Sequence, residues 1–438
     1  MAAKILKGTF LMTPEGLKVD YGVRVEGERI IQIAPNHQLK IEEGDEVTVL
    51  NNQIILPGFV NGHNHMYGFL SHGITAETMV TEFSSFLDDF WWPYVENRLN
   101  HELVEATTRW ACVEMIESGV TSFVDILEGP NTIPGALEIE KNIVKDAGLR
   151  GRLSFEACER ISLKNGQLGL KENIEFVKEY NHGNQLVKGI NSIHTLFTCS
   201  PPFVSQAKKL ADDNDCMVHM HLSESVFEPN WCMEHYGKTP VEVYEELGYL
   251  DSNVLASQVV QVKDMELDIL AKHGVKVVSM PLSNCEVGGG FAPVTKMLER
   301  GMTVGLGTDG YVNNFFEVMR GAFLMHKANQ QDPQVMSAEC VYKMATCMGA
   351  KAIGIEETGS LKEGNFADMI TVSTELPTPI NTKNVYDQLV LFCNPEQVIN
   401  VMGNGNWLKK EGQVVTLNKE KSRKELYEIT KKFWKVNS

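Results

Sequence analysis

Short apolar runs recur between Leu56 and Gly310, and amphipathic helical stretches separate them. Each run is long enough for one buried strand, and together with the run before His63 they number about eight, as a closed parallel barrel requires. The later runs cover residues 120–126, 151–157, 188–194, 216–221, 254–260, 275–280 and 303–309. This alternation predicts an α/β fold, a (β/α)8 TIM-like barrel.

The intervening stretches carry helix signals. Residues 102–118 place Leu103, Ala106 and Trp110 at helical spacing and stop at Gly119, a residue typical of helix ends. A long insertion at residues 66–99 is rich in aromatic residues. Such a stripe more often packs in a core than contacts a substrate, but this one follows the first strand and is the best candidate for a lid.

The two ends of the chain differ from its middle. Residues 1–56 alternate short strand-like runs with turns, and residues from 359 onward resume this character. We therefore expect a composite β-sandwich domain from 1–56 and 359–438, flanking a metal-dependent barrel over 57–358. The charged, periodic stretch 419–435 predicts a terminal helix with a solvated face.

Polar residues that bind metals follow the first predicted strand. The apolar run 54–60 leads into His63 and His65, and residues two apart on a strand point to the same side. Asn64 should therefore turn away from the two histidines. A single His-x-His pair is usually coincidental, so the prediction of a metal site depends on further ligands.

Two more candidate ligands end later runs. His221 closes the run 216–221, and Asp309 closes the run 303–309 at a Gly-rich turn. In a parallel barrel these strand ends meet at one mouth, so His63, His65, His221 and Asp309 should form one site. Three imidazoles and a carboxylate suit Zn²⁺, with Fe²⁺ as the alternative. Lys188 lies at the start of its strand, where it could not bridge a second ion, so we expect one divalent metal.

Composition restricts the partners. The formal net charge is −17, which argues against nucleic acid and against an anionic membrane surface, because both require a basic footprint. The first residues lack a secretory signature, and no apolar stretch approaches a membrane span. We expect a cytoplasmic homodimer that acts on a small heterocyclic molecule.

Two other kinds of site are excluded. The nine cysteines contain no Cys-x-x-Cys pair, which disfavours the zinc deaminases whose metal lies between His-x-Glu and Pro-Cys-x-x-Cys motifs. Residues 305–310 satisfy the pattern Gly-x-Gly-x-x-Gly, but a dinucleotide site needs this pattern early in a βαβ unit, with an acidic residue about 20 positions later. Neither condition is met here.

The chain resembles the amidohydrolase superfamily along almost its whole length, and within it the S-adenosylhomocysteine/methylthioadenosine deaminases and triazine hydrolases. The resemblance rests on segments that occur in the family's order: PGFVNGHNH, WPYVENRL, MIESGVTSFVDI, IHTLFTCSPP, HMHLSES, SNCEVGGGFAPV, GLGTDG and GSLKEGNFADMITV. It implies that His63, His65, His221 and Asp309 bind the metal and that Glu224 carries protons. It also implies that His194 and Glu96 line the substrate site.

The implied chemistry is hydrolytic deamination. A bound cation lowers the pKa of its water, and Glu224 can then move a proton from that water to the ring and the departing ammonia. Asp309 should both bind the metal and orient the water, which gives it a catalytic role. We further expect Gln258, at the end of the sixth strand, and Trp92, in the aromatic insertion, to contact the substrate.

Departures from the family pattern leave alternatives open. The sixth strand offers Ser257 and Gln258 where related deaminases have a histidine, and neither side chain titrates near neutral pH. An arginine expected late in the third strand is Glu156 here, which would suit a cationic ligand or would pair with Arg150 or Arg152. The chain is then a deaminase, a hydrolase that expels another leaving group, or a metal-retaining binding protein whose catalysis has faded.

Overall fold

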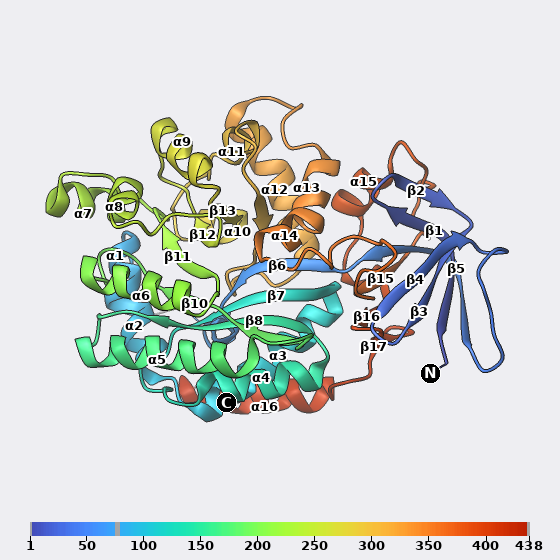
Figure 1. The fold of residues 1–438 in the computed structure, drawn as a ribbon, viewed down its shortest axis with the longest axis horizontal. Helices are drawn as coiled ribbons and strands as arrows, with labels where there is room; N and C mark the ends of the chain where they lie inside the picture. The colour runs from blue at the N-terminus through green and yellow to red at the C-terminus, as the bar shows by residue number, and fades with distance from the viewer. Residues whose placement is uncertain (1, 75–78, 436–438) are drawn as a thin grey trace.

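A closed parallel barrel forms the centre of the molecule in the computed structural model, which describes residues 2–74 and 79–435. The barrel closes because β10 pairs with both β8 and β11 (Figure 1). The predicted run 188–194 is divided into two short strands, so nine strands occupy eight positions. They are β6 (Phe59–Asn64), β7 (Val120–Leu127), β8 (Arg150–Ala157), β9 (Val187–Gly189), β10 (Asn191–Ile193), β11 (Val218–Leu222), β12 (Val254–Gln258), β13 (Lys276–Ser279) and β14 (Val304–Leu306). The predicted fold class is confirmed.

Helices surround this barrel. The predicted helix after residue 101 is present as α3 (His101–Ser118): the Asn100 side chain accepts a hydrogen bond from the Leu103 amide at its start, and Gly119 ends it with a φ of 85°. The other described helices of eight or more residues outside the C-terminal end are α4 (Ala136–Ala147), α5 (Leu163–Tyr180), α6 (Pro201–Asp213), α7 (Phe227–Tyr236), α9 (Asp264–His273) and α12 (Phe315–Gln330). Shorter ones are α8 (Pro240–Glu246), α10 (Pro281–Glu286), α11 (Val294–Glu299), α13 (Ala338–Met344) and α14 (Cys347–Ala352).

Both ends of the chain contribute to a second sheet beside the barrel (Figure 1). Its order is β18-β17-β16-β15-β5-β1-β3-β4, with β2 paired to β1. Its N-terminal strands are β1 (Lys4–Thr13), β2 (Gly16–Val19), β3 (Tyr21–Glu26), β4 (Arg29–Pro35) and β5 (Glu46–Pro57). Its C-terminal strands are β15 (Met369–Ser373), β16 (Val398–Gly403), β17 (Asn406–Lys410) and β18 (Gln413–Val414). The antiparallel pairing of β5 with β15 joins the two ends.

The apolar run 54–60 is not one strand, as the sequence suggested, but parts of two. β5 ends at Pro57 in the second sheet, and β6 begins at Phe59 in the barrel. Gly58 lies between them, where a Cβ would come within 2.0 Å of the Thr121 hydroxyl. Only glycine therefore fits this close approach, and the chain passes there from one sheet to the other.

The aromatic insertion after β6 is a series of short helical turns. They are η1 (Met66–Ser71), α1 (Phe83–Ser85), the π-helical η2 (Phe86–Trp91), α2 (Trp92–Tyr94) and η3 (Glu96–Arg98). Residues 75–78 of the insertion lie outside the described residues. Three further turns, α15 (Val385–Asp387), η4 (Gln388–Phe392) and η5 (Pro395–Gln397), precede β16.

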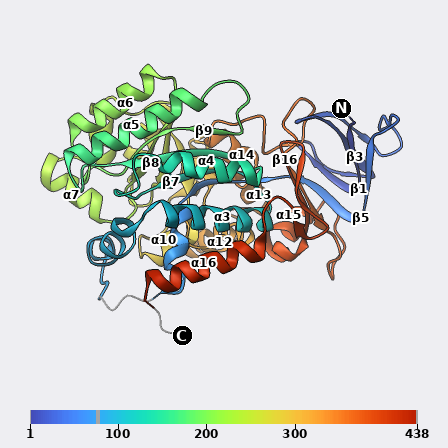
Figure 2. The same cartoon turned by 90° about the horizontal axis from the view of Figure 1, so that it is seen from below.

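The terminal helix α16 (Lys419–Phe433) packs against α3 of the barrel, as Figure 2 shows from below. The Arg98 guanidinium donates to the Phe433 carbonyl, and the Trp434 indole donates to the Leu70 carbonyl at 2.5 Å. The C-terminal segment thus holds both ends of the aromatic insertion.

Among the described residues, no helix combines the length and apolar character needed to cross a membrane.

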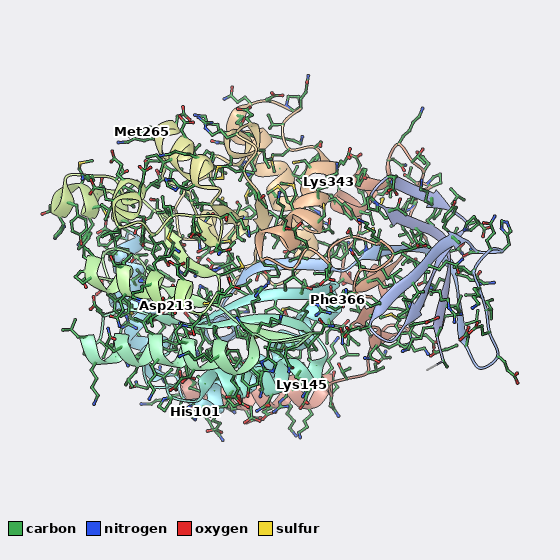
Figure 3. The ribbon with its side chains drawn as sticks, in the orientation of Figure 1. His101, Lys145, Asp213, Met265, Lys343 and Phe366 are labelled. Carbon is green, nitrogen blue, oxygen red and sulfur yellow. The ribbon has the colours of Figure 1, made fainter. Side chains whose placement is uncertain are left out.

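A buried ion pair joins the barrel to the second sheet. The Arg150 Nε at the start of β8 donates to the Asp368 Oδ2 at 2.8 Å, and both side chains are almost fully buried. The Asp368 Oδ1 also accepts from the Asn404 amide. Phe366, labelled in Figure 3, lies at this junction, with the guanidinium of Arg150 at 3.7 Å from its ring centroid.

Replacing Asp368 with Ala should lower the free energy of unfolding by about 3–5 kcal/mol, because it leaves the Arg150 guanidinium buried without its partner. Urea denaturation followed by circular dichroism measures this change. The matched control is Glu339→Ala, which removes the exposed Glu339–Lys343 pair and should cost at most about 0.5 kcal/mol. Equal losses in the two variants would contradict the role given to the buried pair.

Candidate metal centre and active site

Three strand ends bring four potential ligands together at one mouth of the barrel. His63 lies in β6 and His65 directly follows it, His221 lies in β11, and Asp309 follows β14. One ligand atom from each of these side chains lies within 4.8 Å of the others. Asn64 points elsewhere and accepts a hydrogen bond from the Thr308 hydroxyl at 2.9 Å. The structure thus gathers the four residues that the sequence singled out.

The spacing of the ligand atoms suits one small cation. The Nε2 atoms of His63 and His65 are 3.2 Å apart, and the Asp309 Oδ1 lies 2.9 Å from the first and 3.4 Å from the second. Tetrahedral zinc with bonds of 2.0–2.1 Å has its ligand atoms about 3.3 Å apart. These side chains therefore fit a single divalent ion without large movement.

Outer hydrogen bonds fix the orientation of two of the imidazoles. The Nδ1 of His65 donates to the Ile126 carbonyl at 2.7 Å, and the Nδ1 of His221 donates to the Glu156 Oε1 at 2.7 Å. With a proton on Nδ1 in each case, Nε2 is the nitrogen that faces the metal position. The Asp309 Oδ2 accepts from the Gln258 amide at 3.1 Å and from the Ser283 hydroxyl at 2.5 Å.

The protonation states agree with this arrangement. Burial lowers the pKa of His63 and of His221, so both imidazoles are neutral at physiological pH. Burial opposes the ionisation of Asp309, but hydrogen bonds from His63 and His65 hold its pKa well below the ordinary value. Two neutral imidazoles and an ionised carboxylate are in the forms that bind a divalent cation.

The backbone turns sharply where the strands end. Ser223, Gln258 and Asp309 all have positive φ, at 49°, 75° and 61°. Such conformations are unfavourable for residues with a Cβ and cluster at functional sites. They take the chain out of the sheet and leave Gln258 and Asp309 facing the cavity.

A cavity of about 570 Å³ opens over the four ligands. Glu224 and His194 line it beside the metal site, and the aromatic insertion supplies much of its wall through Phe83, Phe86, Phe90 and Trp91. Enclosure raises the pKa of Glu224 well above its ordinary value, and the charge of Asp309 adds to this effect. Burial lowers the pKa of His194 to about 4, so this ring is neutral.

Two residues expected at the substrate site lie behind the cavity wall. Glu96 is buried, accepts a hydrogen bond from the Tyr67 hydroxyl at 3.4 Å and pairs with Arg160 at 2.8 Å. Trp92 lies beneath the Arg160 guanidinium, which is 4.6 Å from its ring centroid. Neither lines the cavity, where the neighbouring Trp91 is found instead, whereas the expected Gln258 and His194 do line it.

Glu156 does not pair with Arg150 or Arg152, which was one of the roles that the sequence left open for it. Arg150 pairs with Asp368, and Arg152 donates to the Gly354 carbonyl. Glu156 instead accepts from His221, so it supports a metal ligand from outside. Sequence reasoning could not find this contact, because it joins two strand ends 65 residues apart.

Glu128 is a site residue that the sequence analysis missed. It follows β7, lines the cavity, and has its Oε1 3.8 Å from the His194 Nε2. Its Oε2 accepts from the Tyr67 hydroxyl at 3.3 Å. The signal was present, because Glu128 follows an apolar strand in the same way as Asp309 does.

Comparison with known proteins agrees with this geometry. Residues 54–408 match the model of the Amidohydrolase family. The chain belongs to this family. This amidohydrolase is 32% identical over 405 residues to a 5′-deoxyadenosine deaminase of Methanothermobacter thermautotrophicus, with 91% of each chain covered. It is 31% identical over 408 residues to a 5-methylthioadenosine/S-adenosylhomocysteine deaminase of Carboxydothermus hydrogenoformans, with 92% of each covered. It is thus a hydrolase of carbon–nitrogen bonds other than peptide bonds.

Solved structures show the same amidohydrolase fold. An adenosine deaminase of Xanthomonas campestris with bound zinc superposes with a TM-score of 0.91 over 99% of both chains, at 20% identity. The zinc complex of an atrazine chlorohydrolase of Arthrobacter aurescens superposes with a TM-score of 0.87 at 19% identity, over 98% of this chain and 100% of the other. These likenesses confirm the fold.

Replacing Glu156 with Leu should weaken zinc binding by about 10–100-fold, since loss of an outer partner leaves the His221 ring without its orienting acceptor. Competition with a chromogenic chelator measures this affinity. Glu156→Gln keeps an oxygen acceptor of the same size and should retain most of the affinity. An unchanged affinity in the Leu variant would show that the contact does not support the metal.

Proposed function

We propose that this amidohydrolase is a metal-dependent aminohydrolase that releases ammonia from an amino-substituted nitrogen heterocycle such as a purine, pterin, pyrimidine or triazine. The observation that carries the proposal is the position of Glu224 on the same cavity wall as the cluster of His63, His65, His221 and Asp309. Relatives named as deaminases of 5′-deoxyadenosine and methylthioadenosine favour adenine nucleosides within this class.

The cavity suits a flat ring of this kind. A volume of about 570 Å³ lies within the range of small-molecule sites. Phe86 and Trp91 stack on each other in its wall, with ring centroids 5.5 Å apart. Aromatic faces such as these bind planar heterocycles through stacking and apolar contact.

The described residues divide the chemistry among them. A divalent ion at the four ligands would supply a water of lowered pKa as the nucleophile. Glu224 takes one proton from the water and delivers it to the ring nitrogen, and its raised pKa lets it hold that proton between the two transfers. The second proton of the water leaves with the amino group as ammonia. His194 is neutral, and its Nδ1 is engaged by the Thr198 hydroxyl at 2.8 Å, which leaves Nε2 to hydrogen-bond the substrate.

Gln258 stands where related deaminases have a histidine. Its amide donates to Asp309 and its carbonyl oxygen accepts from Asn284, so it orients a metal ligand and takes no part in proton transfer. Ser257, the other candidate at this strand end, donates to the Met220 carbonyl inside the barrel. Acid and base catalysis therefore falls to Glu224.

Several finer assignments belong to the same proposal. Zinc, rather than iron, is favoured by the three imidazoles and by zinc in the similar structures. We retain the division into a barrel over 57–358 and a β domain from 1–56 and 359–438, although α16 lies on the barrel. A cytoplasmic homodimer is likewise retained as a proposal.

The decisive experiment combines metal analysis with an ammonia-release screen of amino-heterocycles, using enzyme loaded with Zn²⁺ or Fe²⁺. Stoichiometric metal and ammonia release from one of these compounds would support the proposal. Release of an amine or halide without ammonia would assign the other hydrolase class. Bound metal with tight binding but no turnover of any compound would assign a binding protein.

Replacing Glu224 with Gln should lower kcat by at least about 100-fold and leave the metal content unchanged, because the amide cannot transfer the proton. Steady-state ammonia release and elemental analysis measure the two quantities. Glu234→Gln, an exposed change on α7, serves as the matched control and should keep full activity. If the Glu224 variant kept the rate of the parent, this residue would have no part in the reaction.

A further inference from the structure

We propose that the substrate carries a positive charge, as a protonated amine or guanidine attached to the reacting heterocycle, and that Glu128 is the residue that recognises this charge. The inference rests on the proposed function, because it names the class of substrate for that same cavity.

The charged groups around the cavity are of one sign. Its acidic residues are Glu128, Glu224 and Asp309 inside and Glu286 at the exposed rim, and within the described part of the chain neither lysine nor arginine lines it. A divalent ion at the metal site offsets the charges of Asp309 and Glu224. Glu128 and Glu286 are then left without a positive charge near them in the cavity wall. A cationic ligand would supply this positive charge, whereas an anionic ligand would be repelled.

Glu128 belongs to a carboxylate cluster that is short of cations. Glu96 and Glu156 flank it, and the nearby Arg160 is held by Glu96 at 2.8 Å. One oxygen of Glu156 is used by His221, and the other is buried without a hydrogen-bond partner. Burying several carboxylates with one guanidinium is costly unless further donors approach them. A ligand ammonium or guanidinium would bring such donors to the cavity side of the cluster.

Within the cluster, Glu128 is the carboxylate placed to meet a ligand. It lines the main cavity, whereas Glu96 and Glu156 do not. Burial opposes its ionisation, but the neighbouring carboxyl groups of Glu156 and Glu96 hold its pKa well below the ordinary value. The cluster therefore concentrates its negative charge on the one member that the substrate can reach.

The wall beside Glu128 is aromatic, which also favours a cation. The Tyr67 hydroxyl donates to Glu128, and the Tyr67 ring lies 5.9 Å from the Trp91 ring. Trp91 in turn stacks on Phe86. Ring faces attract ammonium and guanidinium groups, and a carboxylate next to them supplies a charge-assisted hydrogen bond. A carboxylate or phosphate on the substrate would find neither interaction here.

Charge-matched substrates test the inference. Two scaffolds, adenine nucleosides and diaminotriazines, are each prepared with a neutral, a cationic and an anionic substituent; for the first these are 5′-deoxyadenosine, 5′-amino-5′-deoxyadenosine and adenosine 5′-monophosphate. We expect the cationic member of at least one scaffold to exceed the neutral member by about tenfold in kcat/KM, and the anionic member to be the poorest. Equal values for all three charge forms in both scaffolds would overturn the inference.

Replacement of Glu128 separates recognition from a structural role. Glu128→Gln should remove most of the difference in kcat/KM between the cationic and the neutral compound, and Glu128→Asp should preserve the order. Thermal melting confirms that both variants fold, and Glu234→Gln is the control for loss of a remote charge. An equal loss on neutral and cationic substrates would assign Glu128 a structural role and overturn its assignment.

The outcome can be told apart from failure of the proposed function. Ammonia release from the neutral compounds with no preference for the cationic compounds would support the deaminase assignment and contradict the inference of charge recognition. If none of the compounds released ammonia, isothermal titration calorimetry with the same set would decide it. Tighter binding of the cation that is lost in Glu128→Gln would uphold charge recognition without deamination, and equal or absent binding would overturn it.

Discussion

Three imidazole nitrogens and one carboxylate oxygen share a space in which every pair lies within 4.8 Å, and the rest of the site is organised to keep them there. Lone pairs that face each other in a poorly solvated space repel unless a positive charge lies between them. Without an ion that charge is a proton: burial disfavours it, but Asp309 outweighs burial and raises the pKa of His65 to about 9. A divalent cation would displace this proton and bind all four ligands at once.

The barrel meets this requirement through the way its strands end. Residues with positive φ follow β11, end β12 and follow β14, and each such position costs of order 1–3 kcal/mol. Hydrogen bonds hold these turns, since the Val260 amide donates to the Ser223 carbonyl and the Asp309 amide donates to the His63 carbonyl. The second bond ties one ligand-bearing strand to the next. Strain at the mouth is therefore maintained by the same contacts that set the spacing of the ligands.

Much of this could be predicted from the sequence, because strand ends are a local signal. The positions of His63, His221 and Asp309 followed from apolar runs and from the geometry of a parallel barrel. Glu128 gives the same signal and was overlooked because no second motif drew attention to it. The exchange of Trp92 for Trp91 in the cavity wall has a different cause. The π-helical turn Phe86–Trp91 changes which side chains of the segment face the cavity, and no residue pattern in the insertion predicts such a turn. Contacts such as His221 with Glu156 depend on tertiary packing and could not be read from spacing alone.

Gln258 stands in place of a histidine, and this replacement gives the acidic groups of the cavity different roles. Gln258 holds Asp309 with an uncharged amide, so it adds no positive charge beside the metal ligands. A histidine there could become cationic and would compete with an ion for the same carboxylate. In the proposed mechanism, Glu224 is then the titrating group next to the reacting atoms, and Glu128 carries its charge on the side of the aromatic wall. One carboxylate then serves the chemistry and another serves recognition. The cavity can consequently favour a cationic heterocycle without placing that cation against the metal.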